Sequence, residues 1–338
     1  MSLEALHRIV RGEEVERRHA SDLLRAFADG GATSEQLAAF LTALTIRGEN
    51  IPALLGFVDV LRERYIPVDL GDIPAMCVCG TGGDGQHTVN LSTSSAFVVA
   101  AAGVPVAKHG NHAVSSMAGS ADVLGALQVP YKLDPAGVAA MVKEIGLGFI
   151  YAPAHHPLFA KIGPVRRLLG FRTAFNLLGP IVNPAQVKRQ VIGAPSVKIM
   201  HLIAETLAEL GTDRAMVVHT PGPYDEVSLT APAKALLVEK GSITDLEFTP
   251  SDFGAETILP QDLVGGDAES NAQRIIRVFQ GEESPLRNAI CANAACALLV
   301  AGRVADVREG YALAQDVIAR GLVLEKLKQA QEFRVGVA

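Results

Sequence analysis

Apolar side chains in the first 65 residues recur at the spacing of amphipathic helices. Thr33 and Gln36 form a capping box ahead of one apolar stripe, which consists of Leu37, Phe40, Leu41 and Leu44. Asn50 is placed to cap the next helix, whose inward residues are Leu54, Leu55, Val58 and Leu61. Side chains three and four positions apart lie on one helix face. The pattern predicts a helical segment, and the glycine and proline residues of 67–74 indicate a linker after it.

From Met76 onward, short apolar runs alternate with helical patterns, which is typical of α/β proteins. We expect strands at residues 76–79, 104–107, 148–151, 190–193, 214–219 and 235–238. The predicted fold class is α/β: a small, all-helical N-terminal domain and a large domain with a mostly parallel central sheet flanked by helices. The predicted boundaries are 1–70 for the helical domain and 71–338 for the α/β domain. Residues 163–185, rich in Pro, Gly and Arg, are a candidate segment returning to the helical domain.

The composition and charge of the chain argue against several classes of protein. The formal net charge is −6, which argues against a sequence-independent grip on nucleic acid. No apolar run approaches membrane-spanning length, and the N-terminus lacks the features of a signal peptide, so a cytoplasmic enzyme is expected. Four cysteines match no ordinary zinc spacing and are expected to be buried, reduced thiols; they are Cys77, Cys79, Cys291 and Cys296.

Residues 79–93 carry the strongest chemical signal in the chain. Four glycines surround Asp84, and hydroxyl and amide side chains follow at Thr88, Asn90, Ser92 and Thr93. Apolar residues on both sides predict a strand, a glycine turn and the start of a helix. Backbone N–H groups at such a turn form an anion site. The spacing is neither that of a Walker loop nor a good match to the dinucleotide fingerprint. A phosphate or diphosphate is therefore the expected ligand.

Residues 108–122 form a second polar segment behind a predicted strand. Lys108 is expected to emerge where that strand ends, at the sheet edge where open α/β sheets bind ligands. A lysine there suits phosphate, and Ser116 and Ser120 would add hydrogen-bond donors. Ser120 is also a candidate N-cap for the helix that follows. Both polar segments thus predict one phosphate-rich ligand.

Together these two motifs resemble those of the anthranilate phosphoribosyltransferase family, and matching segments run from about Gln36 to about Lys328. The further matches are His156-Pro157, residues 164–173, Asn176-Leu177-Leu178-Gly179-Pro180, Asn183-Pro184, Tyr224-Asp225-Glu226-Val227-Ser228, residues 265–272 and Asn293-Ala294-Ala295. The resemblance implies Mg²⁺-dependent transfer of a phosphoribosyl group from 5-phosphoribosyl 1-diphosphate to the amine of anthranilate, in tryptophan biosynthesis. It implies positioning and metal assistance rather than a catalytic triad.

The resemblance also implies the roles of individual residues. The donor site would contain Gly80, Gly83, Asp84, Thr88, Asn90, Ser92, Thr93, Lys108, Ser116 and Ser120. Anthranilate would be bound by Gly80, His109, Asn111, His156 and Arg166, with Arg166 facing the carboxylate. Two Mg²⁺ ions would be held by Ser92, Asp225 and Glu226, the first by Ser92 and Glu226 and the second by both carboxylates. The apolar stripe of the first helices favours a homodimer.

One departure and two alternatives accompany this interpretation. The family usually has arginine where this chain has His112, which leaves the charge beside the substrate entrance open. A pyrimidine nucleoside phosphorylase shares the fold type, but it needs a Ser-Gly-Arg-Gly-type segment where this chain has Lys108-His109-Gly110-Asn111. A non-catalytic nucleic-acid-binding paralogue would need a basic groove and eroded motifs. Only a local basic region is present here, at Lys108, Arg166, Arg167 and Arg172.

Overall fold

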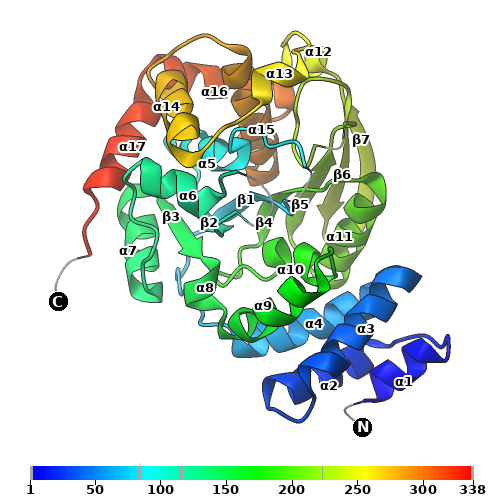
Figure 1. Cartoon of the computed structure of the whole chain (residues 1–338). Coiled ribbons are helices and arrows are strands. Elements are labelled where there is room, and N and C mark those ends of the chain that lie inside the picture. Colours follow the sequence, from blue (N-terminus) through cyan, green and yellow to red (C-terminus); the bar gives the residue numbers. More distant parts are fainter. Residues whose placement is uncertain (1–2, 83–84, 114–116, 223, 336–338) are drawn as a thin grey trace.

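The N-terminal part of the chain is entirely helical. A computed structural model describes residues 3–82, 85–113, 117–222 and 224–335, and Figure 1 shows the first helices grouped at one end of the molecule. These helices are α1 (Glu4–Val10), α2 (Arg17–Ala28), α3 (Ser34–Arg47) and α4 (Ile51–Arg64). The predicted caps are confirmed, since the Thr33 side chain accepts a bond from the Gln36 N–H and the Asn50 side chain accepts one from Ala53.

A seven-stranded sheet forms the centre of the rest of the chain (Figure 1). Its strands are β1 (Met76–Gly80), β2 (Val106–Gly110), β3 (Leu147–Tyr151), β4 (Arg189–Gly193), β5 (Arg214–His219), β6 (Ala233–Glu239) and β7 (Ser242–Phe248). Their order is β3-β2-β1-β4-β5-β6-β7, and the first five are parallel while β6 and β7 are antiparallel. The predicted fold class is confirmed. All six expected strands exist, whereas β7 was not expected.

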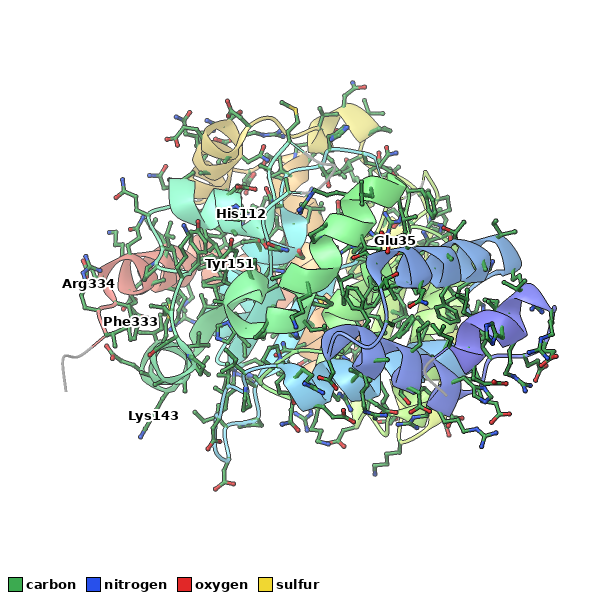
Figure 2. All side chains as sticks on the ribbon, turned by 60° about the horizontal axis from the view of Figure 1, so that its bottom comes forward. Glu35, His112, Lys143, Tyr151, Phe333 and Arg334 are labelled. Carbon is green, nitrogen blue, oxygen red and sulfur yellow. The ribbon has the colours of Figure 1, made fainter. Side chains whose placement is uncertain are left out.

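Helices cover both faces of the sheet and complete two large cores and a smaller third one. The helices of this part are α5 (Leu91–Ala101), α6 (Ser120–Ala126), α7 (Pro135–Ile145), α8 (Ala152–His155), α9 (Pro157–Leu169), α10 (Phe175–Ile181), α11 (Val197–Glu209), α12 (Pro250–Phe253), α13 (Pro260–Leu263), α14 (Ala268–Phe279), α15 (Pro285–Ala301), α16 (Val307–Ala319) and α17 (Leu322–Glu332). One core joins Met76 and Val78 to α5 and α14–α17, and it reaches Phe333 near the C-terminus (Figure 2). The opposite core joins Cys77 and Cys79 to α1–α4 and α9–α11. All four cysteines are buried and free, as expected.

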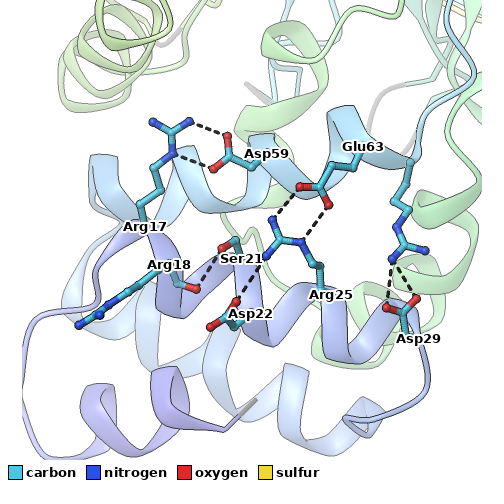
Figure 3. A network of polar contacts seen from close by, with 9 residues as sticks. Arg17, Arg18, Ser21, Asp22, Arg25, Asp29, Asp59 and Glu63 are labelled. Carbon is cyan, nitrogen blue, oxygen red and sulfur yellow. Dashed lines mark hydrogen bonds and ion pairs between the residues drawn. The ribbon is translucent and has the colours of Figure 1, made fainter. Parts of the chain in front are cut away.

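Paired arginines and carboxylates connect α2 to α4 on the surface of the helical part (Figure 3). Arg17 binds Asp59 with two bonds of 2.6 and 2.7 Å, and Arg25 binds Glu63 with two bonds of 2.7 and 2.9 Å. A guanidinium matches a carboxylate in this two-pronged geometry. Because these pairs are partly exposed, we assign them a modest share of stability and attribute most of the packing to the apolar stripes.

The middle of the chain packs against the N-terminal helices. Helix α9 contacts α3 and α4, and α10 contacts α4. The rings of Phe57 and Phe175 stack with centroids 5.0 Å apart, and the Lys161 ammonium donates to the Ala28 carbonyl at 2.8 Å. The boundary at residue 70 stays a prediction. No helix in the described part of the chain combines the length and apolar character needed to cross a membrane.

Candidate functional site

The glycine-rich segment starts at the carboxyl end of β1 and meets the acidic motif of the sequence. The Gly82 N–H donates to Oδ2 of Asp225 at 2.7 Å, and the Thr81 N–H donates to the Gly193 carbonyl at 3.0 Å. A Cβ atom on Gly80 would overlap the Asp225 carboxylate, and one on Gly193 would overlap the Asp225 backbone carbonyl. The close approach of these segments therefore requires glycine at both strand ends.

The Asp225-Glu226 pair is held in a buried loop after β5. The Thr220 hydroxyl donates to the Glu226 carbonyl at 2.7 Å, and the Glu226 residue is 7% exposed. Asn293, from the long helix α15, accepts a bond from the Val227 N–H at 3.1 Å and donates to the Val227 carbonyl at 2.8 Å. Two side chains thus fix the backbone that directly follows the carboxylates. This role of Asn293 was not predicted from the sequence, where the residue only belonged to a matching motif.

The expectation that Lys108 emerges at the end of its strand is wrong. Strand β2 continues to Gly110 because its backbone pairs with β3 up to Tyr151, so Lys108 lies inside the sheet and is 2% exposed. Its ammonium donates to the Val78 carbonyl at 2.6 Å and to the Ser92 hydroxyl at 3.2 Å. Burial lowers the pKa of Lys108, and the nearby charges of the thiols and of Asp225 oppose that effect. Lys108 therefore orients the Ser92 hydroxyl from within the sheet.

The predicted phosphate-binding side chains gather at the N-terminus of α5. Thr88 and Ser92 are half-buried, and the Thr93 hydroxyl is buried without a hydrogen-bond partner among the described residues. The Asn90 amide donates to the Ala118 carbonyl at 3.0 Å and so ties this segment to the second polar segment. A helix N-terminus with spare hydroxyls is suited to a phosphate. Three predicted donor-site residues lie outside the described part of the chain, namely Gly83, Asp84 and Ser116.

The second polar segment folds back on itself beside α6. Ser120 is the first residue of α6, and Gly119 is its N-cap, so the expected capping role of Ser120 is wrong. The Ser120 hydroxyl instead exchanges two bonds of 3.2 Å with the backbone of Asn111. The Asp122 carboxylate provides the capping, because it accepts bonds from the N–H groups of Gly119 and Ala113 at 2.8 and 2.9 Å. This arrangement brings Asn111 and Ser120 together.

His112 occupies an aromatic setting at the same segment. Its Nδ1 lies 2.5 Å from Oδ1 of Asp122. The rings of Tyr131 and Tyr151 meet the imidazole edge to face, with centroids 5.9 and 5.3 Å away, and Figure 2 places His112 beside Tyr151. The position where the family resemblance predicts arginine is thus occupied by a ring whose Nδ1 is directed at the Asp122 carboxylate.

Two predicted anthranilate-binding histidines are buried together, on the face of β2 opposite to the Lys108 side chain. The rings of His109 and His156 lie 5.0 Å apart, and Phe159 and Tyr65 pack against His156 at 4.7 and 5.9 Å. Nδ1 of His109 lies 2.9 Å from the Gly179 carbonyl. A carbonyl only accepts, so Nδ1 carries the proton and Nε2 is an acceptor. That Nε2 is buried without a partner among the described residues.

Arg166 and Arg172 add positive charge near the glycine turn. The Arg172 guanidinium donates to the Gly82 carbonyl at 2.6 Å, a contact that the sequence did not predict. Burial, and then the charge of Arg172, lower the pKa of Arg166. No oxygen of the described residues is hydrogen-bonded to the Arg166 guanidinium. A half-buried arginine in this setting is suited to an anionic ligand.

The acidic pair has the chemistry of a magnesium site. Carboxylates and a hydroxyl are hard oxygen donors, and Mg²⁺ usually takes one or two carboxylates together with substrate phosphate. Asp225 lies against the glycine turn through Gly82, and Ser92 is linked to the same region through Lys108. Across the parts of the chain that are described, no three His, Cys, Asp or Glu side chains cluster as an all-protein metal site. The residues therefore fit an ion shared with phosphate.

Acidification should destabilise the fold through the two buried histidines. Burial lowers the pKa of His109 to about 4 and that of His156 to about 2, against about 6.5 in the unfolded chain. Above pH 6.5 these histidines do not reduce the free energy of unfolding. Below that pH the free energy of unfolding falls, because the unfolded state then binds protons that the native state excludes. We expect the free energy of unfolding to fall by about 2 kcal/mol per histidine between pH 6.5 and pH 5. Urea unfolding at both pH values measures it.

His156→Phe would retain aromatic packing against Phe159 and should reduce this loss by about half. His201, exposed on α11, provides the matched control, and His201→Gln should leave the pH dependence unchanged. An equal pH dependence in the His156→Phe variant and the unaltered protein would show that other groups cause the loss.

Comparison with known proteins gives matches over almost the whole chain. Residues 3–65 match the helical bundle domain of a glycosyl transferase family, and residues 73–324 match its a/b domain. The chain is 43% identical to an anthranilate phosphoribosyltransferase from Anaeromyxobacter dehalogenans, covering 97% of each protein. Its structure is similar to the crystal structure of that enzyme from Thermus thermophilus, with a TM-score of 0.91 and 37% identity over 97% of this chain and 98% of the other. It shares its fold with the Saccharomyces cerevisiae enzyme in complex with PRPP and Mg, with a TM-score of 0.88 and 23% identity over 97% and 96% of the two chains.

Proposed function

The chain belongs to the anthranilate phosphoribosyltransferase family, and we propose from its site how it transfers the 5-phosphoribosyl group of 5-phosphoribosyl 1-diphosphate to the amine of anthranilate. The reaction gives N-(5-phosphoribosyl)anthranilate and diphosphate and serves tryptophan biosynthesis. The observation that carries the proposal is the 2.7 Å bond between Gly82 and Asp225. It joins the expected diphosphate turn to the expected metal carboxylates, which are 143 residues apart.

We infer that the donor's phosphate groups bind at the glycine turn and the start of α5. The supporting features are the backbone N–H groups of that helix and the hydroxyls of Thr88, Ser92 and Thr93. Ser120 would contribute through its position beside Asn111. Lys108 acts indirectly in this proposal, because its ammonium holds the Ser92 hydroxyl. The roles of Gly80, Gly83, Asp84, Asn90 and Ser116 in the donor site stay predictions.

Two Mg²⁺ ions per subunit are proposed, held by Ser92 with Glu226 and by Asp225 with Glu226. When bound, they would neutralise the charge that develops on the departing diphosphate. Asp225 keeps the glycine turn in place through Gly82, and Thr220 and Asn293 keep the acidic loop in place. The protein thus supplies preorganised oxygen atoms, which need little rearrangement on ligand binding.

Anthranilate is proposed to bind on the other side of β2, where Arg166 would meet its carboxylate and His109, Asn111 and His156 would surround the ring and amine. Nε2 of His109 is a buried acceptor, and an amine N–H is a suitable donor for it. The bond from C1 of the ribose to the diphosphate oxygen breaks, and a bond from C1 to the amine nitrogen forms. The proton of the amine then leaves to diphosphate or water. An already neutral aromatic amine requires positioning more than a strong base.

The proposed enzyme is a cytoplasmic homodimer. Its dimer contact would involve the N-terminal helices, because Val10 at the end of α1 and Ile46 near the end of α3 are 73% and 80% exposed. Helices α1 and α3 contact each other. Apolar exposure of this kind is typical of association sites.

Anthranilate is fluorescent, and its fluorescence should decline only when the phosphoribosyl donor and Mg²⁺ are both present. Within that assay, Arg166→Ala should reduce kcat/KM for anthranilate about ten- to a hundredfold, because it removes a charge-assisted contact to a carboxylate. The KM for the donor should change little. Arg166→Lys should restore only part of the activity, since an ammonium cannot form the planar two-pronged contact.

Arg167→Ala is the matched control, because Arg167 is the exposed neighbour in the same helix turn and should leave both KM values unchanged. A larger loss of donor affinity than of anthranilate affinity in Arg166→Ala would place Arg166 in the phosphate site and overturn the acceptor assignment.

A further inference from the structure

A segment far along the chain forms the other wall of the glycine-rich loop. Residues 263–265 run antiparallel to residues 87–89 and pair with their backbone. The Val89 N–H donates to the Leu263 carbonyl at 2.9 Å, the Gly265 N–H donates to the His87 carbonyl at 2.7 Å, and Thr88 and Val264 form a β-bridge. The strand-like pairing places residues 263–265 directly beside the proposed phosphate hydroxyls. Whatever holds this segment therefore also holds the loop.

Asn271, in the first turns of α14, connects three parts of the site. It is 1% exposed, and its Oδ1 accepts a bond from the Gly266 N–H at 2.8 Å. Its amide group donates to Oδ1 of Asn90 at 3.2 Å, and the Asn90 amide in turn donates to the Ala118 carbonyl. A buried amide that bonds on both sides costs free energy when either partner is lost. Asn271 thus links α14 to both polar segments of the site.

Arg274 holds the same segment from one turn further along the helix. Its two terminal nitrogens donate to the carbonyls of Asp262, at 2.7 Å, and Val264. Burial lowers the pKa of this arginine, and the carbonyl bonds take the place of water around the guanidinium. The planar fork fixes both carbonyls at once, which a lysine could not do. Arg274 thereby immobilises the segment that pairs with Thr88.

The apolar face of α14 packs into the protein core. Ala272, Ile275, Val278 and Phe279 are buried in the core that includes α5 and α15. Burial of this face accounts for the attachment of the helix to the protein. The polar side chains of Asn271 and Arg274 are directed at the loop.

We propose that Asn271 and Arg274 are positioning residues for the phosphoribosyl-diphosphate site, acting through the 262–266 segment and Asn90. The inference rests on the proposed function, because it assumes that the loop binds the donor. A loop held in its binding geometry loses less conformational entropy when the ligand binds. Loss of either side chain should therefore weaken donor binding specifically. Anthranilate, on the other face of β2, should be affected little.

The test uses a near-isosteric change. Asn271→Asp retains an acceptor for the Gly266 N–H but places an oxygen against Oδ1 of Asn90, where the amide now donates. We expect KM for the donor to rise about tenfold, with KM for anthranilate at saturating donor unchanged. Arg274→Gln should have a similar effect. Arg277→Gln is the matched control on the same helix, because Arg277 is paired with Glu282 at 3.1 Å, and its donor KM should stay at the unaltered value.

Calorimetric binding of the donor with Mg²⁺ provides a readout independent of turnover. Weaker donor binding in Asn271→Asp and Arg274→Gln, with little change in the melting temperature of Arg274→Gln, supports the proposal. Equal rises in both KM values, or a lower melting temperature with unchanged donor binding, would show a purely structural role and overturn it. Absence of anthranilate consumption by the unaltered protein would instead reject the proposed function, and the binding measurement would still decide the role of α14.

Discussion

Asp225→Asn and Glu226→Gln should each lower turnover by about two to three orders of magnitude, the usual loss when a group that stabilises developing charge is removed. At position 225 the change preserves the contact with the glycine turn. The Asn side-chain oxygen can still accept the bond from the Gly82 N–H, so the glycine turn should stay in place. The negative charge facing the proposed metal site would be lost, together with its favourable interaction with the Lys108 ammonium. Turnover measured at saturating Mg²⁺ and both substrates gives the effect.

Asp245→Asn is the control for this pair, because Asp245 is an exposed carboxylate on β7, away from the glycine turn. It should retain full turnover. Thermal unfolding of all three variants should show similar midpoints if the losses are electrostatic. Undiminished turnover in both Asp225→Asn and Glu226→Gln would refute the assignment of the acidic pair to the metals.

Gly193→Ala should damage both stability and activity. A Cβ atom at the end of β4 would overlap the Asp225 backbone carbonyl, so the acidic loop must move away from the sheet. Forced shifts of this kind typically lower the free energy of unfolding by about 1–3 kcal/mol. Here they also displace the carboxylate that accepts the hydrogen bond from the Gly82 N–H. We expect an unfolding free energy lower by about 2 kcal/mol and turnover reduced at least tenfold. Urea unfolding and steady-state kinetics measure the two effects.

Gly125→Ala is the contrasting substitution. Gly125 lies within α6, and the atom nearest to an added Cβ is Cε1 of Tyr131 at 3.6 Å, an ordinary contact. Alanine is favoured over glycine in a helix by about 0.5–1 kcal/mol, so this variant should be as stable as the unaltered protein or more so. If Gly193→Ala were equally well tolerated, the close packing of β4 on the acidic loop would not be needed for function.

The helices and buried strands could be predicted because their signals are local. Capping residues and apolar stripes define α3 and α4 within about fifteen residues, and continuous apolar runs define the parallel strands. The end of β2 could not be predicted in this way. Its last residues include Lys108 and His109, whose polarity resembles a loop, and only pairing with β3 keeps them in the sheet. Lys108 was consequently expected at the surface.

Only part of the site could be predicted from local sequence patterns. The glycine turn can be interpreted from its own residues, but its contact with Asp225 depends on chain topology, since an acidic pair alone is ordinary on a protein surface. Resemblance to a family supplied that connection. The contact of Arg172 with Gly82 and the anchoring by Asn271 and Arg274 involve side-chain bonds to backbone carbonyls or amides. Such bonds leave little trace in a single sequence, because arginine and asparagine are common on helix surfaces.

Strand β7 was missed because it is polar, and that polarity has a consequence for the behaviour of the protein in solution. The strand forms one end of the sheet, and it carries exposed Thr244, Asp245 and Glu247. A free strand edge can pair with another chain, and charged side chains along it oppose such pairing. Two carboxylates on β7 would approach two identical carboxylates if copies met edge to edge. The sheet should therefore resist growth into aggregates at high protein concentration, although its interior strands are strongly apolar.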